Sequence, residues 1–158
     1  MASQLPSFPR FVFTVLEPIS LLAGFFPAVL FPHWFISEQI ATWGPPVAST
    51  DHAQLVARQL GNCYLLAFLV GVAVLYTTTE IKVVRNYLVA LWLADISHVG
   101  LTLHGIGYDK SLAVGEWNAM TWGNVGATTF LFLTRSAYFA GLFGRDGPRH
   151  SSGEKKAQ

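Results

Sequence analysis

Residues 87–103 read YLVALWLADISHVGLTL, an apolar run whose only acidic or basic side chains are Asp95 and His98. Its length approaches the roughly 20 residues that an α-helix needs to cross the hydrocarbon core of a bilayer. Three further apolar stretches of similar length lie at residues 11–31, 60–76 and 125–143. The sequence therefore predicts an all-α integral membrane protein, a bundle of four transmembrane helices.

The overall composition agrees with a membrane protein and argues against other classes. Of the 158 residues, 52% are hydrophobic and 12% are charged, and the mean hydropathy is +0.42. Soluble domains carry roughly a quarter charged residues, so this chain has too little polar surface to cover a globule in water. The net charge of +1 offers no clustered basic face for nucleic acid. The single cysteine, Cys63, excludes an intrachain disulfide.

The chain is expected to form one transmembrane domain, residues 1–144, followed by a polar, disordered cytosolic tail at residues 145–158. Thr50 followed by Asp51 is typical of a helix N-terminus, so the second helix is expected to begin well before Leu60.

The first apolar stretch is expected to be a retained helix rather than a cleaved signal peptide. It is long for the apolar core of a signal peptide, contains Glu17 and lacks a clear small-residue cleavage site. Pro18 and Pro27 predict a kinked helix, because proline has no N–H to donate to the preceding turn. Neighbouring helices must then satisfy the carbonyl groups that the prolines leave free.

Lysine and arginine are distributed unevenly between the two sides of the predicted bundle. With four helices, one side holds seven of them, namely Arg10, Lys82, Arg85, Arg145, Arg149, Lys155 and Lys156. The other side holds two, Arg58 and Lys110. Because cytosolic segments carry the excess of positive charge, both termini are expected in the cytosol. The bias and the uncleaved first helix fit insertion at the endoplasmic reticulum.

Four ionisable side chains lie inside the predicted helices, where each is costly and normally faces the protein interior or a cavity. They are Glu17, Asp95, His98 and Arg135. At about 1.5 Å of rise per residue, Glu17 lies roughly 10 Å from the flank marked by Arg10. Asp95 and Arg135 each lie roughly 15 Å from the basic residues at the same side. The spacing therefore predicts that Glu17, Asp95 and Arg135 meet at one depth.

Polar side chains also fall on one face of the third helix and on one face of the fourth. Asp95, His98 and Thr102 share a face of the third helix at i, i+3 and i+7, and Trp92 extends that face. The polar face of the fourth helix consists of Thr121, Asn124, Thr128, Arg135 and Tyr138. Such faces have no favourable place in lipid except against one another.

One arginine cannot neutralise two carboxylates, so one carboxyl group of the Glu17 and Asp95 pair is expected to stay protonated near neutral pH. A neutral carboxylic acid in an apolar pocket can donate a proton, which predicts general acid catalysis. The structural alternative is that Arg135 pairs with Asp95 or Glu17 and only holds the bundle together. For His98, a hydrogen bond to Asp95 and a proton-shuttle role both fit. His33 and His52 lack ligand spacing, so no metal site is expected.

Several segments together resemble a known group of small fungal four-helix membrane proteins. The segments are Glu17-Pro18-Ile19-Ser20 with Gly24, Leu60-Gly61-Asn62-Cys63-Tyr64-Leu65, Ala94-Asp95-Ile96-Ser97-His98, Trp122-Gly123-Asn124 and Arg135-Ser136-Ala137-Tyr138. Members occur beside secondary-metabolite genes. Over roughly residues 11–144, the chain is similar to the small membrane-bound terpene cyclases of fungal meroterpenoid pathways, of the ascofuranone and macrophorin type. It is too short for the larger indole-diterpene cyclases, so none of their residues is carried over.

The resemblance implies a terpene cyclase that protonates an epoxide or alkene of a prenyl chain and so starts carbocation cyclisation. Asp95 or Glu17 would be the acid, the other carboxylate and Arg135 would tune it, and His98 would relay or accept a proton. The candidate substrate-binding residues are Trp92, Asn62, Tyr64, Thr102, Asn124, Thr128 and Tyr138. No cofactor is expected, and the chain has no Asp-rich diphosphate and Mg²⁺ motif. The expected partners are the bilayer, a prenylated substrate and other membrane enzymes of the same pathway.

Two other functions fit the same residues. One is a small membrane isomerase or oxygenase of secondary metabolism. The other is a non-catalytic scaffold or lipid-binding protein, in which Glu17, Asp95 and Arg135 are purely stabilising. Geometry separates catalysis from scaffolding: both carboxyl groups beside one apolar cavity favour the acid catalyst. A bridging Arg135 with no remaining cavity favours the scaffold.

Overall fold

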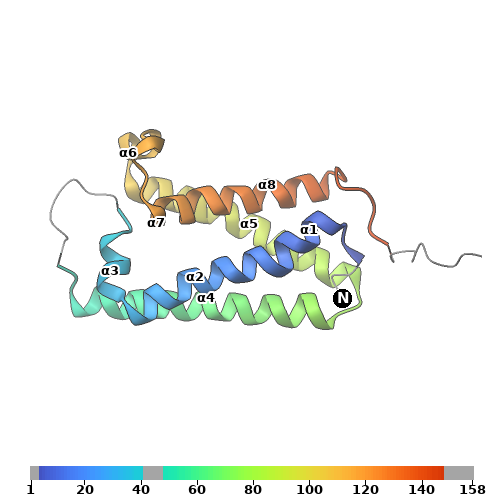
Figure 1. Ribbon diagram of the computed structural model, residues 1–158, viewed down its shortest axis with the longest axis horizontal. Coiled ribbons are helices and arrows are strands. Elements are labelled where there is room, and N and C mark those ends of the chain that lie inside the picture. The colour runs from blue at the N-terminus through green and yellow to red at the C-terminus, as the bar shows by residue number, and fades with distance from the viewer. Residues whose placement is uncertain (1–3, 41–47, 148–158) are drawn as a thin grey trace, which may run out of the picture.

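Four long helices run along the long axis of the structure, a computed structural model that describes residues 4–40 and 48–147 (Figure 1). The first passes through α1 (Ser7–Phe11), the π-helical turn η2 (Val12–Leu16) and α2 (Glu17–Leu30). The second and third are α4 (Asp51–Thr77) and α5 (Ile81–Ile106). The fourth combines α7 (Ala119–Thr121), the π-helical turn η4 (Trp122–Ala127) and α8 (Thr128–Phe139). The connections contain α3 (Pro32–Ser37), α6 (Tyr108–Leu112) and the 3₁₀ turn η3 (Val114–Glu116).

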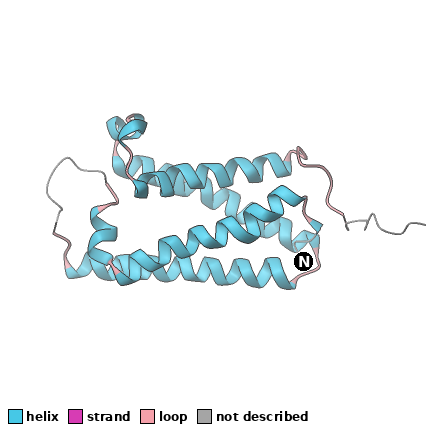
Figure 2. Ribbon diagram, in the orientation of Figure 1, coloured by secondary structure: helices cyan, strands magenta, loops and turns pink. Residues whose placement is uncertain are grey.

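The predicted all-helical class is confirmed, since the described residues contain only helices and loops (Figure 2). Among these residues, three helices are long and apolar enough to cross a membrane: Ser7–Leu30, Asp51–Thr77 and Ile81–Ile106. Only 22%, 17% and 6% of their apolar windows are buried inside the bundle. So much outward-facing apolar surface is compatible with an integral membrane protein. The fourth long helix, residues 119–139, is not among the three.

The helices extend beyond the apolar stretches of the sequence because they are capped by polar residues. Thr50 caps α4 as predicted: its Oγ1 accepts a hydrogen bond from the Ala53 N–H at 3.2 Å. The fourth helix begins at residue 119, where the Asn118 side chain accepts from the Thr121 N–H at 2.8 Å. It ends before Gly141, whose φ of +76° places it in the left-handed region that closes many helices.

Pro18 explains the π-helical turn that precedes it. Its missing N–H and its ring disturb the turn that holds the Thr14 carbonyl, and a π-helical turn is one way a helix absorbs such a disturbance. The Tyr76 hydroxyl of α4 donates a hydrogen bond to the Thr14 carbonyl oxygen at 2.8 Å. The prediction that a neighbouring helix satisfies a freed carbonyl is therefore confirmed at this position.

The bundle is built from two helix pairs, because α2 packs mainly on α4 and α5 mainly on α8. In the first pair, Gly61 permits close contact: a Cβ there would lie 2.7 Å from Val29 Cγ2. At the end that holds the N-terminus, the pairs are joined by a core of Leu5, Val12, Phe13, Leu75, Val84, Leu88 and Tyr138. A smaller cluster at the α3 end contains Ala28, Phe35 and Ala57, with Tyr64 and Met120 packed against it.

The described part of the polar tail, residues 145–147, lies against the end of the bundle that holds the N-terminus. Asp146 Oδ2 accepts hydrogen bonds from Arg85 Nη2 at 2.7 Å and from the Tyr138 hydroxyl at 2.8 Å. The Gly147 N–H donates to the Gln4 carbonyl oxygen at 3.1 Å. These contacts hold residues 146 and 147 against the bundle. The rest of the predicted tail lies outside the described residues.

Candidate functional site

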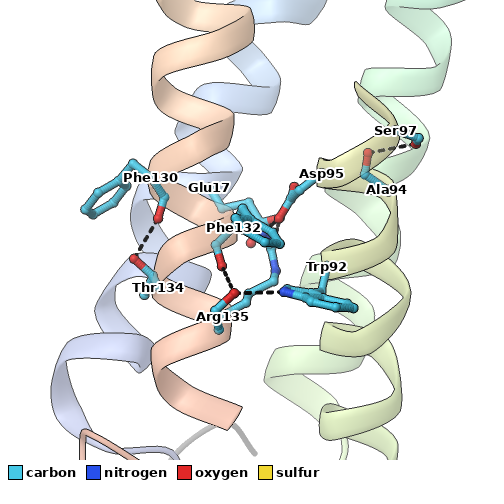
Figure 3. A network of polar contacts seen from close by, with 10 residues as sticks. Glu17, Trp92, Ala94, Asp95, Ser97, Phe130, Phe132, Thr134 and Arg135 are labelled. Atoms are coloured by element: carbon cyan, nitrogen blue, oxygen red, sulfur yellow. Dashed lines mark hydrogen bonds and ion pairs between the residues drawn. The ribbon is translucent and has the colours of Figure 1, made fainter. Parts of the chain in front are cut away.

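Arg135 joins both candidate acids in the middle of the bundle (Figure 3). Its Nη1 donates to Asp95 Oδ2 at 2.5 Å, and its Nη2 donates to Glu17 Oε1. The arginine is 0% exposed, and Glu17 and Asp95 are 6% and 8% exposed. The prediction that these three residues meet at one depth is confirmed. Their roles in chemistry stay predictions.

Three different long helices supply the ion cluster, which we define as Glu17, Asp95 and Arg135. Glu17 begins α2 directly after the π-helical turn, and Pro18 follows it. Asp95 lies in the middle of α5, and Arg135 lies in α8. The guanidinium carbon of Arg135 lies 5.2 Å from the centre of the Phe13 ring, close enough for a cation–π contact. The cluster therefore ties the two helix pairs together.

A cavity of about 440 Å³ lies between the two helix pairs, on the α3 side of the ion cluster. Its walls are mostly apolar, and its volume is within the range of small-molecule sites. Its lining residues include Glu17, Ser20, Leu21, Ala23, Gly24, Pro27, Trp34, Tyr64, Ala67, Leu91, Ala94, Asp95, His98, Met120, Gly123, Asn124, Ala127, Thr128 and Leu131. Both carboxyl residues thus border the same apolar space.

The two carboxyl groups differ in what their second oxygen meets. Glu17 Oε2 and Arg135 Nε are both enclosed, and neither atom has a hydrogen-bond partner among the described residues. Asp95 Oδ1 has no protein partner there either, but it is not among the enclosed atoms. Since Asp95 lines the cavity, its free oxygen is the one that open space can reach.

The fourth helix forms its cavity wall with an irregular turn. The π-helical turn η4 contributes Gly123, Asn124 and Ala127, and Thr128 follows directly. π-Helical turns inside α-helices are rare and are found frequently at functional sites.

A chain of polar side chains leads away from the cavity toward α3. His98 and Asn124 both line the cavity, and the Asn124 side chain is a polar neighbour of the His98 ring. Asn124 Nδ2 donates to Gln39 Oε1 at 3.3 Å, and Gln39 Nε2 donates to the Phe35 carbonyl oxygen at 3.2 Å. No hydrogen bond joins His98 to Asp95 in the described part of the chain. His98 therefore meets the polar face of the fourth helix, as the sequence indicates, but does not form the hydrogen bond to Asp95 that was one of its two expected roles.

The candidate substrate-binding residues divide into two groups. Tyr64, Asn124 and Thr128 line the cavity. Trp92 and Tyr138 do not: the Trp92 Nε1–H donates to Ser136 Oγ at 2.9 Å, and Tyr138 contacts Asp146. Figure 3 shows the Trp92 side chain directed toward α8. Asn62 lies on the exposed surface of α4, and Thr102 is partly buried outside the cavity lining.

Other lining residues were not among the sequence candidates. Trp34 and Met120 border the cavity. Gln39, which holds Asn124, follows α3 in a turn that has no periodic pattern. No sequence signal could have found Gln39, because it lies in a turn outside the apolar helices, where helix rise and periodicity do not determine its position. Within the described residues, no group of three or more His, Cys, Asp or Glu side chains could hold a metal ion.

Comparison with known protein families places the chain in one of them. Residues 2–145 match the family described as "Domain of unknown function (DUF7704)". Because this match covers most of the chain, the protein belongs to that family. No curated protein matches the chain, and no solved structure does so either.

Proposed function

We propose that the protein is a membrane-bound terpene cyclase of the meroterpenoid kind, in which Asp95 protonates an alkene or epoxide of a prenyl chain. The observation that carries the proposal is the shared cavity: Glu17 and Asp95 both border one largely apolar space of about 440 Å³. A protonation-initiated cyclisation needs a neutral acid, an apolar chamber that excludes water, and no other reagent. The ion cluster can supply the acid, and the cavity can supply the apolar chamber.

The charge balance of the ion cluster supports an acid at this position. Arg135 contributes one positive charge and its two partners contribute two carboxyl groups, so full ionisation would leave a net negative charge in a buried place. Such a charge is costly, and the neutral form of one carboxyl group removes it. We assign the donated proton to Asp95, because its free oxygen is the accessible one. Glu17 and Arg135 then form a fixed ion pair beside it.

The proposed membrane arrangement has four spans with both termini in the cytosol, at the endoplasmic reticulum. The helix of residues 119–139 is less hydrophobic than the other three, but its polar side chains Asn124, Thr128 and Arg135 face the cavity or the ion cluster. Residues 4 and 147 are hydrogen-bonded to each other, so the first and the last described residues lie at the same end of the bundle. A prenyl chain is itself lipid-soluble and can reach the cavity from the bilayer.

The proposal is tested with Asp95→Asn and Glu17→Gln in microsomes supplied with an epoxyfarnesyl or a farnesyl phenol. Asp95→Asn should abolish cyclisation, because the amide cannot deliver the proton. Glu17→Gln should reduce it, because Asp95 then becomes the ionised partner of Arg135. Asp109→Asn and Glu80→Gln are matched controls, since both residues are exposed and distant from the cavity lining. Turnover that survives in Asp95→Asn would contradict the proposed acid.

A double-bond isomerase would use the same acid, and product analysis in the same assay separates it from a cyclase. An isomerised product retains the ring count of the substrate, whereas a cyclised product has gained one or more rings. Oxygen consumption by the purified protein would instead indicate an oxygenase.

A non-catalytic lipid-binding scaffold is favoured by one specific observation: Arg135 holds Glu17 and Asp95 at once. Such a bridge joins three helices whether or not chemistry takes place. In that case Asp95→Asn should lower the thermal unfolding temperature and the yield of folded protein. An Asp95→Asn variant that stays folded but loses turnover would exclude the scaffold as the whole function.

A further inference from the structure

The polar chain His98–Asn124–Gln39 has a fixed hydrogen-bonding direction. The Phe35 carbonyl oxygen can only accept, so the Gln39 amide must turn its NH₂ group toward it. Gln39 Oε1 can then only accept, and Asn124 supplies the NH₂ group that donates to it. This leaves Asn124 Oδ1 as the acceptor for a ring N–H of His98.

The second ring nitrogen of His98 consequently carries a lone pair. In a neutral imidazole one nitrogen donates and the other accepts, and the partner of the first determines which is which. His98 lines the cavity, and no other hydrogen-bond partner meets it in the described part of the chain. A hydrogen-bond acceptor is therefore free beside an otherwise apolar space.

We propose that this free nitrogen binds the hydroxyl group of a lipid alcohol or phenol, with Asn124 and Gln39 as positioning residues. A hydroxyl group suits the position because it donates the hydrogen bond that His98 lacks. The long apolar part of such a ligand suits the walls formed by Leu21, Tyr64 and Met120. The inference rests on the cavity of the proposed function and adds a class of ligand to it.

The position of His98 relates the hydroxyl group to the proposed acid. His98 lies three residues after Asp95 on α5, which is about 4.5 Å along the helix axis and nearly the same face. A hydroxyl group bound at His98 therefore places the adjoining carbon atoms within about one helical turn of the Asp95 carboxyl group. The two polar contacts would fix one orientation of the ligand.

The test measures binding, so it does not depend on turnover. The full chain in lipid nanodiscs is titrated with farnesol and with farnesyl methyl ether, which has the same chain but no hydroxyl donor. The Asp95→Asn variant is titrated in parallel to exclude chemistry. We expect farnesol to bind about two- to tenfold more tightly, which corresponds to the net contribution of one hydrogen bond. His98→Phe should bring the two affinities together by weakening farnesol binding only.

Gln39→Leu tests the positioning role from outside the cavity, because Gln39 is not a lining residue. It should lower the preference for farnesol and leave the binding of the ether unchanged, which a merely structural defect would not do. This variant also decides the question where His98→Phe does not fold. His104→Phe is the matched control, since His104 is exposed on the same helix and should leave the preference intact.

The inference is overturned if the wild-type protein binds neither ligand, if it binds both equally, or if the preference persists in His98→Phe or Gln39→Leu. Its failure can be told apart from that of the proposed function. A protein whose turnover requires Asp95 but which ignores the hydroxyl group contradicts only this inference. A protein that prefers farnesol but whose turnover ignores Asp95 contradicts only the proposed acid.

Discussion

The two ends of the bundle are built differently although the same four helices form both. At the end that holds the N-terminus, Val12, Phe13 and Leu88 are each 0% exposed and belong to the core that joins the helix pairs. Toward α3 the pairs enclose a cavity, and small residues such as Ala67 and Gly123 form part of its wall. The ion cluster lies at the boundary between the two. This difference indicates that the packed end provides stability and leaves the hollow end available for binding.

The largest loss of stability is expected from a substitution in the ion cluster, which lies between the packed end and the hollow end. Arg135→Met removes the cation and leaves two carboxyl groups buried without a partner, which should destabilise the protein by about 3–5 kcal/mol. Thermal or denaturant unfolding in nanodiscs measures it. The triple variant Arg135→Met, Glu17→Gln, Asp95→Asn should recover most of that loss, because no unpaired charge remains. An Arg135→Met variant as stable as the wild type would show that the cluster does not join the helix pairs.

A matched pair on α5 compares the two ends directly. Leu88 is 0% exposed in the packed core, and Leu91 lines the cavity one turn later. Leu88→Ala should cost about 2–5 kcal/mol, because it creates a new void in a close-packed place. Leu91→Ala should cost about 1 kcal/mol or less, since part of its side chain already borders empty space. Equal losses of unfolding free energy would contradict the distinction between a packed and a hollow end.

A second arginine–carboxylate pair shows how much burial matters to such contacts. Arg85 binds Asp146 at 2.7 Å, but the Arg85 side chain is 58% exposed. Arg85→Met, which leaves the hydrogen bond from Tyr138 to Asp146 in place, should therefore lower the unfolding free energy by no more than about 1 kcal/mol, and the loss should shrink further at high salt. A loss comparable to that of Arg135→Met would mean that the chain end stabilises the bundle far more than its exposure suggests.

The smallest effect on stability is expected from filling the cavity. Ala67→Leu adds a side chain to space that is already empty, so the unfolding temperature should stay close to the wild-type value while ligand binding and turnover fall sharply. Ala73→Leu makes the same change on the exposed face of α4 and should alter neither. Full turnover in Ala67→Leu would contradict the placement of the ligand.

The ion cluster could be predicted from the sequence because its three ionisable residues lie within apolar stretches. Ionisable side chains are rare in apolar helices, and helix rise with alternating direction determines their depth. Thus Glu17, Asp95 and Arg135 could be brought together without coordinates. The early start of α4 could likewise be predicted from Thr50, whose hydroxyl group caps the helix.

The cavity could not be predicted in the same way, because it depends on how far two helix pairs separate. Tyr64 and Asn124, both candidates from the sequence, line the cavity, but Trp92 stacks on Phe132 with ring centres 5.6 Å apart. The spacing of an aromatic side chain along a helix does not distinguish a position in a cavity from one at a helix contact or in lipid. The start of α5 at Ile81 was also missed, since Lys82 and Arg85 end the hydropathic stretch but not the helix.

The most direct test of the central claim, that Asp95 delivers a proton inside the cavity, follows solvent hydrogen into the product. Microsomes in D₂O are supplied with a farnesyl phenol. The mass of the product is determined by mass spectrometry after its oxygen-bound deuterium has been exchanged back in H₂O. The account predicts a cyclised product with one deuterium retained on carbon, formed by the wild type and by Asp109→Asn but not by Asp95→Asn. A cyclised product without carbon-bound deuterium, or one formed equally by Asp95→Asn, would contradict it.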